Sequence, residues 1–177
     1  ITPLLLICWG SFAAVSKLVL RGIDSFQLQF YMFGIAALIM SFTIAASGRL
    51  KEFISVSGEN FSSLVIYSLP CFMYYFLYTM SLKLIPASEA SMLNYLFPIL
   101  TVVFAIPINK EKLKGASVIS ILLGFTGMLI IVSGGRLSQI RMTNITGDVL
   151  ALLAAASWGI FSNLGKKNKI NDLFSNY

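Results

Sequence analysis

The sequence contains no histidine, and charged residues supply only 11% of its 177 positions. A soluble domain carries about 25% charged residues because water must solvate its surface, so the composition excludes an ordinary soluble protein. Hydrophobic residues supply 57% of the chain, and the mean hydropathy is +0.84. Since hydrocarbon solvates apolar side chains and penalises charged ones, this shortage of charge predicts an integral membrane protein.

Reactive side chains are scarce as well. The two cysteines, Cys8 and Cys71, lie inside apolar stretches and are interpreted as small hydrophobic residues rather than a disulfide framework. No spacing is typical of metal ligands, so we expect no metal and no cofactor. An intramembrane enzyme would need clustered His, Asp, Cys or Glu at depth, and we therefore expect no catalysis.

Six apolar stretches are long enough to cross a bilayer, which takes about 20 residues in a helix. They cover residues 3–21, 26–47, 61–82, 87–108, 114–133 and 147–165. The connections between them are too short to hold a soluble domain. The sequence therefore predicts an all-α, multi-span helical bundle in contact with membrane lipid.

Lys and Arg divide unequally between the two sides of this predicted bundle, eight against five. The larger group comprises Arg49, Lys51, Lys110, Lys112, Lys114, Lys166, Lys167 and Lys169. The smaller group comprises Lys17, Arg21, Lys83, Arg136 and Arg141. The positive-inside rule then predicts a cytoplasmic N-terminus. The net charge of +6 does not indicate nucleic-acid binding, because these residues form no single basic face.

An internal repeat connects the first and last spans. Trp9-Gly10-Ser11-Phe12, with Lys17 five residues later, recurs 149 positions on as Trp158-Gly159-Ile160-Phe161 with Lys166. A repeat of five spans, an odd number, inserts its second copy upside down, which is the plan of many secondary transporters. Chance is the alternative, because Trp and Gly are common in membrane helices.

The repeat predicts two parts of the chain. Residues 1–135 would form a first repeat of five helices, and residues 147–177 would begin an inverted second repeat with the sixth helix. A complete second copy would give a protein of roughly 300 residues and ten spans. We therefore expect the chain to be an N-terminal fragment whose missing partner is the remainder of the second repeat.

Several motifs resemble the EamA-type family of the drug/metabolite transporter superfamily. They are Trp9-Gly10-Ser11-Phe12 with Lys17, the stretch 87–132 with Asn94, Pro98, Lys110-Glu111-Lys112-Leu113, Gly115, Gly124 and Gly127, and Gly147-Asp148 followed by Trp158-Gly159. The resemblance covers nearly the whole chain. It implies a ten-helix carrier with cytoplasmic termini and a central cavity between two repeats. Family members move amino acids, nucleotide precursors, other metabolites or drugs, mostly as exporters.

Polar residues in the fourth span recur at helical spacing. Polar groups in a span face the bundle interior or a water-filled cavity, because lipid cannot satisfy them. The steps of three, four and three put them on one helical face. They are Ser91, Asn94, Pro98 and Thr101. Pro98 removes a backbone donor, which suits a kinked helix that lines a substrate pathway. The alternative is that Asn94 only joins neighbouring helices.

Aromatic residues supply further candidates. Tyr74 and Tyr78 belong to a stripe on the third span that could bind a planar or cationic solute, although interfacial anchoring also enriches Tyr. If the repeat is real, Trp9 and Trp158 are symmetry-related and both face the central cavity, with Ser11 nearby on the pathway. Bulky helix packing is the alternative.

Lys17 and Lys166 occupy equivalent positions near opposite membrane faces. We expect each to extend to the lipid headgroups, and contact with a substrate or gate is the alternative. No acidic residue lies near the middle of a span, so proton coupling by a deep acid has no support here. The acidic residues at span ends or in connections are Asp24, Glu52, Glu59, Glu89, Glu111, Asp148 and Asp172.

These features together predict a secondary transporter in the cytoplasmic membrane. It would be an exporter of small organic metabolites such as amino acids or drugs, working by alternating access. The alternative is a non-transporting sensor or assembly protein on a transporter-like scaffold, because a fold alone does not determine a function.

Overall fold

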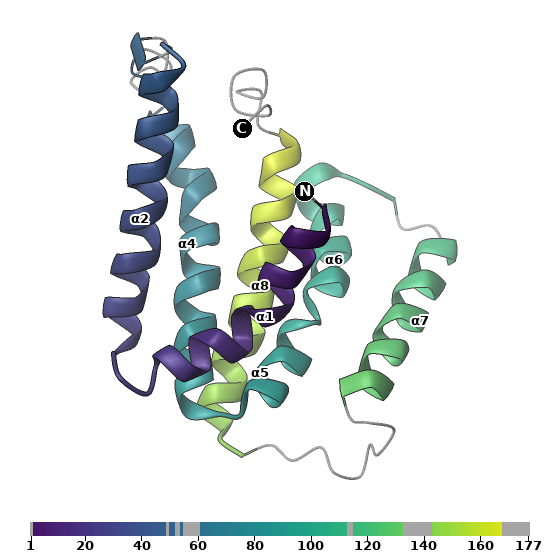
Figure 1. Ribbon diagram of the computed structural model, residues 1–177. Coiled ribbons are helices and arrows are strands. Elements are labelled where there is room, and N and C mark those ends of the chain that lie inside the picture. Colours follow the sequence, from purple (N-terminus) through teal and green to yellow (C-terminus); the bar gives the residue numbers. More distant parts are fainter. Residues whose placement is uncertain are drawn as a thin grey trace.

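The computed structural model describes residues 2–48, 50, 51, 54, 61–112, 115–132 and 143–167, apart from the side chains of residues 4–6, 128, 131, 132 and 167. The described elements are all helices: α1 (Thr2–Val19), α2 (Ser25–Ala46), α4 (Phe61–Leu84), α5 (Ala87–Asn94), α6 (Phe97–Asn109), α7 (Gly115–Val132) and α8 (Ile145–Lys167). Figure 1 shows them as one helical bundle, with α7 to one side. The predicted all-α fold is confirmed for the described residues.

Each of the six predicted spans coincides with a helix or, for the fourth, with the pair α5 and α6. Four stretches are long and apolar enough to cross a membrane: Ser25–Ala46, Phe61–Leu84, Ala87–Asn109 and Ile145–Lys166. The apolar parts of α1 and α7, Ile7–Val19 and Gly115–Gly127, are shorter. The chain is a multi-pass membrane protein.

The start of α2 follows directly from local sequence. The Asp24 carboxylate accepts a hydrogen bond from the Gln27 backbone N–H at 2.8 Å, and the Gln27 side chain accepts one from the Asp24 N–H at 3.1 Å. This reciprocal pair satisfies two backbone donors that a helix N-terminus otherwise leaves unpaired. It fixes the turn that follows α1.

The fourth span is interrupted near Pro98, where a kink was expected, and the interruption is large enough to divide the span into two helices. Pro98 has no N–H to donate to the Asn94 carbonyl, so the helical hydrogen bonding lapses. α5 ends at Asn94 and α6 begins at Phe97. Ser91 and Asn94 therefore lie on α5, whereas Pro98 and Thr101 lie on α6.

The helix α8 runs through the middle of the bundle, packed against α4, α5 and α6 (Figure 1). Small side chains permit this position, because Ala151, Ala154 and Ala155 are fully buried. α1 and α8 run in opposite directions in Figure 1, as the inverted repeat requires of its first helices. The division into two repeats itself stays a prediction.

Large apolar side chains cover much of the outer surface. On α2, Phe30 and Phe42 are each 74% exposed and Leu38 is 72% exposed. Such a surface would be unfavourable in water but is suited to hydrocarbon. The composition of the chain and the exposed surface of α2 therefore both indicate that the protein lies in lipid.

Candidate functional site

Aromatic rings from four helices meet around Trp158 of α8. The ring centroid of Trp158 lies 4.8 Å from that of Tyr74 on α4, 6.1 Å from Trp9 on α1 and 6.3 Å from Phe97 on α6. These separations are within the range of favourable aromatic contacts. The two tryptophans that the repeat makes equivalent are therefore in contact. We call Trp9, Tyr74, Phe97 and Trp158 the aromatic cluster.

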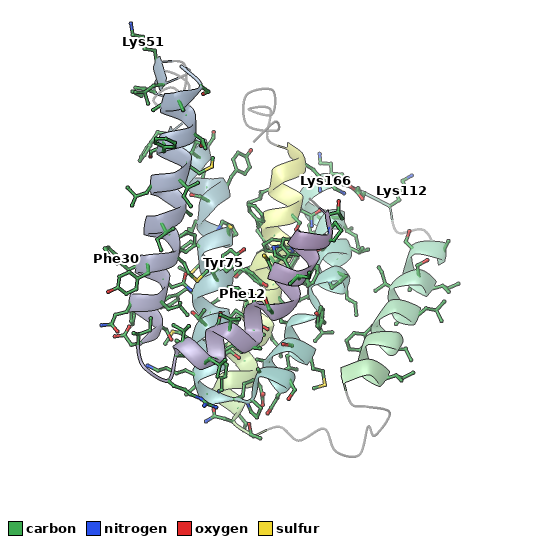
Figure 2. The ribbon with its side chains drawn as sticks, in the orientation of Figure 1. Phe12, Phe30, Lys51, Tyr75, Lys112 and Lys166 are labelled. Carbon is green, nitrogen blue, oxygen red and sulfur yellow. The ribbon has the colours of Figure 1, made fainter. Side chains whose placement is uncertain are left out.

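A second layer of rings lies beside the aromatic cluster. Tyr78 stacks on Tyr74 at 5.9 Å and on Phe12 at 6.1 Å. Figure 2 shows Phe12 of α1 next to Tyr75 of α4, and their ring centroids are 5.7 Å apart. These contacts join α1 to α4, so the side chains flanking Tyr74 are held in place.

Polar groups of α5 reach the same part of α4. The Asn94 side-chain amide donates a hydrogen bond to the Tyr74 hydroxyl at 3.2 Å, and the hydroxyls of Tyr78 and Ser91 are bonded at 3.1 Å. The two hydrogen bonds join α4 to α5, as the helix-joining alternative for Asn94 expects. Among the described residues, however, the Asn94 Oδ1 is buried and accepts no hydrogen bond. The site therefore offers one acceptor beside Tyr74.

The other predicted pathway hydroxyls are bonded within their own helices. Ser11 donates to the Cys8 carbonyl at 3.2 Å, and Thr101 donates to the Phe97 carbonyl at 2.7 Å. Pro98 is exposed. These hydroxyls are less available to a solute than the Asn94 acceptor, while their membership of a pathway stays a prediction.

Lys17 binds backbone carbonyls rather than simply extending to the surface. Its ammonium group donates to the Leu82 carbonyl and, at 2.8 Å, to the Ile85 carbonyl. These carbonyls lie at the C-terminal end of α4, where a cation is stabilised by the helix dipole. Lys17 thus fastens α1 to the end of α4.

Lys166 lies at the other end of the bundle and pairs with Glu111, which follows α6, at 3.2 Å. Both partners are exposed, so water screens the pair and it adds little stability. Figure 2 shows Lys51, Lys112 and Lys166 at the same end of the bundle, as the charge count predicts. Of the larger group, Arg49, Lys114 and Lys169 lie outside the described residues, as do Arg136 and Arg141 of the smaller.

Asn163 is a structural residue that the sequence analysis missed. Its fully buried amide donates to the carbonyls of Thr101 at 2.7 Å and Gly159 at 2.8 Å. Its Oδ1 accepts from the Asn109 side chain at 2.7 Å. One side chain thus joins α8 to both the middle and the end of α6. An intramembrane Asn one turn beyond Gly159 was the available signal.

Replacing Asn163 by leucine is expected to destabilise the fold by about 1–3 kcal/mol, because the Asn109 amide loses its partner while α6 and α8 stay in contact. The fall in unfolding temperature of the purified protein in detergent measures the effect. Ser157→Ala is the matched control, since among the described residues the Ser157 hydroxyl bonds within its own helix, to the Leu153 carbonyl at 2.9 Å. Equal unfolding temperatures for the two variants would contradict the role assigned to Asn163.

The described acidic residues lie at helix ends or in connections, as predicted. The sequence did not reveal that two of them are buried: Glu89 is 7% exposed and Asp148 is 5% exposed. Glu52, Glu59 and Asp172 lie outside the described residues.

Comparison with known proteins gives consistent matches. A sequence model described as the EamA-like transporter family matches residues 3–133. A protein of Archaeoglobus fulgidus named only as an uncharacterized transporter is 30% identical over 169 residues, which cover 92% of this chain and 55% of that protein. The aromatic amino acid exporter YddG of Ancylobacter novellus is 32% identical over 93 residues, 51% of this chain and 32% of that protein.

A third relative, the uncharacterized transporter YyaM of Bacillus subtilis, is 23% identical over 138 residues, 77% of this chain and 45% of that protein. The chain spans about half the length of the curated relatives it matches. No solved structure matches it significantly.

Proposed function

The chain belongs to the EamA-like transporter family, and from this premise we propose that it forms part of a secondary transporter for small organic metabolites. The transporter would work by alternating access, with two inverted repeats moving around a site near the middle of the membrane. Relatives named as transporters support the general activity. The composition supports a carrier rather than an enzyme, because clustered reactive side chains at depth are missing from the sequence.

The observation that carries this proposal is the contact between Trp9 and Trp158, with ring centroids 6.1 Å apart. In an inverted-repeat carrier, equivalent residues lie on either side of the pseudo-two-fold axis, where the substrate binds. Two equivalent tryptophans that meet would therefore mark that axis. The ring centroid of Tyr74 on α4 lies 4.8 Å from that of Trp158. Tyr74 would therefore form a third wall of the proposed substrate site.

The chemistry of the aromatic cluster favours a solute with a planar ring and an ammonium group. Rings stack on tryptophan and tyrosine faces, and cations are attracted to the same faces. The Asn94 Oδ1, which accepts no hydrogen bond from any described residue, would accept one from the ammonium group. We therefore propose aromatic amino acids as the first substrates to test, and export as the direction. The name of the Ancylobacter novellus relative gives independent support.

We propose the cytoplasmic membrane as the location, with the N-terminus in the cytoplasm. The grouping of Lys51, Lys112 and Lys166 at one end of the bundle (Figure 2) supports this orientation, because cytoplasmic connections carry the excess of Lys and Arg. A cysteine introduced at Lys112 would then react with an impermeant thiol reagent only after the cells are opened. Labelling of this cysteine in intact cells would contradict the proposed orientation and place the N-terminus outside the cytoplasm.

Solute counterflow in proteoliposomes tests the transport activity. The complete gene product containing this chain is reconstituted, loaded with an unlabelled solute pool, and supplied with labelled aromatic amino acids, other amino acids or cationic drugs. Accumulation of label driven by the trapped pool is the expected result, greatest for aromatic amino acids. If correctly inserted protein accumulates no label across a broad panel of metabolites, the result would contradict the proposal and favour the sensor alternative.

A further inference from the structure

One end of the bundle is closed by contacts on the C-terminal end of α4. α4 ends at Leu84, and Ile85 follows it. The beginnings of α5 and α8 lie at this end, the lower one in Figure 1. A Cβ added to Gly147, near the start of α8, would lie 2.6 Å from the Ile85 Cγ2 and 3.1 Å from the Leu84 Cβ. The start of α8 therefore lies directly against the end of α4. We call this end of the bundle the Ile85 end.

Hydrogen bonds join two further elements at the Ile85 end. The Lys17 ammonium group of α1 donates to the Leu82 carbonyl and, at 2.8 Å, to the Ile85 carbonyl. Glu89 of α5 accepts hydrogen bonds from the Thr143 backbone N–H at 2.7 Å and from the Thr143 hydroxyl at 2.8 Å, just before α8 begins. Helices of the first predicted repeat are thereby joined to one another and to the start of the second.

Burial along α1, α2 and α4 is concentrated at the same end. Among the described residues of these helices, the buried side chains fall within 16–19 of α1, 25–29 of α2 and 78–84 of α4. The opposite halves carry large exposed side chains, since Trp9 is 68% exposed, Phe42 is 74% exposed and Phe61 is 67% exposed. The three helices are therefore packed most closely at the Ile85 end.

The contact made by Lys17 is of a kind that can be broken and remade. Lys17 is the charged residue of α1 and is half-buried, and in the described part of the chain no ion pair joins it to a carboxylate. Its partners are neutral carbonyls at a helix C-terminus, which a cation satisfies but which water can also solvate. The ammonium group on its flexible stem can in turn reach the lipid headgroups. Separation of α1 from α4 at this end therefore leaves neither partner buried and unpaired.

We propose that Lys17 is a gate residue, which closes the Ile85 end by holding α1 on α4 and releases the carbonyls of Leu82 and Ile85 when this end opens. The inference rests on the proposed function, in which one end of the transporter opens as the other closes. The Ile85 end lies opposite Lys51, Lys112 and Lys166 (Figure 2). With the proposed orientation, Lys17 therefore controls access from outside the cytoplasm. It acts as a positioning residue and needs no contact with the solute.

Thiol labelling of the complete gene product in lipid nanodiscs tests the gate, because a water-soluble maleimide reaches both faces of a nanodisc. Two proteins are compared, each with a single cysteine. In the first, Ser16→Cys places the thiol on α1 at a position that is 5% exposed and is covered at the Ile85 end. In the second, the native Cys71 is kept. Cys71 is half-buried and lies one turn before Tyr74 on α4, farther from the Ile85 end.

Lys17→Met keeps an apolar stem and removes the donors. It is expected to raise the labelling rate at Ser16→Cys by roughly tenfold, the change in population that the loss of one charge-assisted hydrogen bond produces. The rate at Cys71 is expected to fall, because opening of one end closes the other. Lys17→Gln keeps a neutral donor and should give the same pattern at smaller amplitude, so it tests the gate even if Lys17→Met does not fold.

Lys83→Met is the matched control, because it removes an exposed lysine from the last turn of α4, and it should change neither rate. An unchanged rate at Ser16→Cys in both Lys17 variants would overturn the proposal. A rise at both cysteines would overturn it too, because a contact that only stabilises the fold loosens both ends when it is lost. Labelling requires no solute. Opposite changes at the two cysteines with a silent counterflow assay would therefore contradict the proposed substrates and leave the gate standing.

Discussion

Replacing Trp158 by alanine is expected to reduce counterflow of the best substrate by roughly tenfold or more. Trp158 contacts rings from α1, α4 and α6, and it is the shared member of the proposed binding site. Each aromatic contact contributes about 0.5–1.5 kcal/mol beyond its area, and about 1.4 kcal/mol corresponds to a factor of ten in affinity. Initial counterflow rates over a range of substrate concentrations measure the loss and separate KM from maximal rate.

Two control variants distinguish a loss of substrate binding from a loss of correct folding in this experiment. Trp158→Phe keeps a ring in the site and should retain most of the transport. Phe72→Ala removes a ring of α4 that contacts Phe33 and Phe76 rather than Trp158, and it should leave KM unchanged. If Trp158→Ala transports with the wild-type KM and maximal rate, Trp158 is a packing residue and the site lies elsewhere.

Gly159→Val is expected to produce the largest loss of stability, about 2–3 kcal/mol. A Cβ at Gly159 would lie 3.1 Å from the Leu100 carbonyl carbon and 3.1 Å from the Thr101 backbone nitrogen. Backbone atoms of a packed helix cannot move aside as a flexible side chain can, and overpacking of this kind typically costs 1–3 kcal/mol. Separation of α6 from α8 would also stretch the hydrogen bonds of Asn163.

The unfolding temperature and the monodisperse yield of the purified protein in detergent measure this prediction. Gly165→Val is the matched control on the same helix, because in the described part of the chain a Cβ built at Gly165 meets no atom of another helix within 4 Å. It introduces the same side chain without the contact to α6. Equal stability of the two variants would show that α8 can move away from α6 at no cost.

Local sequence is sufficient to predict the helices and their approximate ends. The apolar stretches have the length that a bilayer demands, and the predicted first two spans, 3–21 and 26–47, agree with α1 (Thr2–Val19) and α2 (Ser25–Ala46). Asp24 and Gln27 lie three residues apart, as a capping box requires. The bilayer leaves backbone groups no partner except their own helix, and this is why apolar length alone identifies a helix here.

The consequence of Pro98 was only partly predicted. A proline in a span indicates a kink, but an uninterrupted helical periodicity was assumed for the polar stripe. In the structure the chain leaves the helical path at Tyr95 and Leu96, so Asn94 faces Tyr74 from a separate short helix. The size of a break depends on whether neighbouring helices accommodate it, and the sequence does not specify those neighbours.

The sequence by itself determined the membrane environment, the helices, and the equivalence of Trp9 with Trp158, because each depends on composition or on spacing along one chain. Only the tertiary structure decided that these tryptophans touch, that Gly159 lies against the backbone of α6, and that Glu89 and Asp148 are buried. The two backbone and ring contacts join residues 58 to 149 positions apart. These contacts depend on which faces of α8 are covered by neighbouring helices. The sequence does not decide this, because apolar helices with the same sequence pattern can pack against one another in several ways.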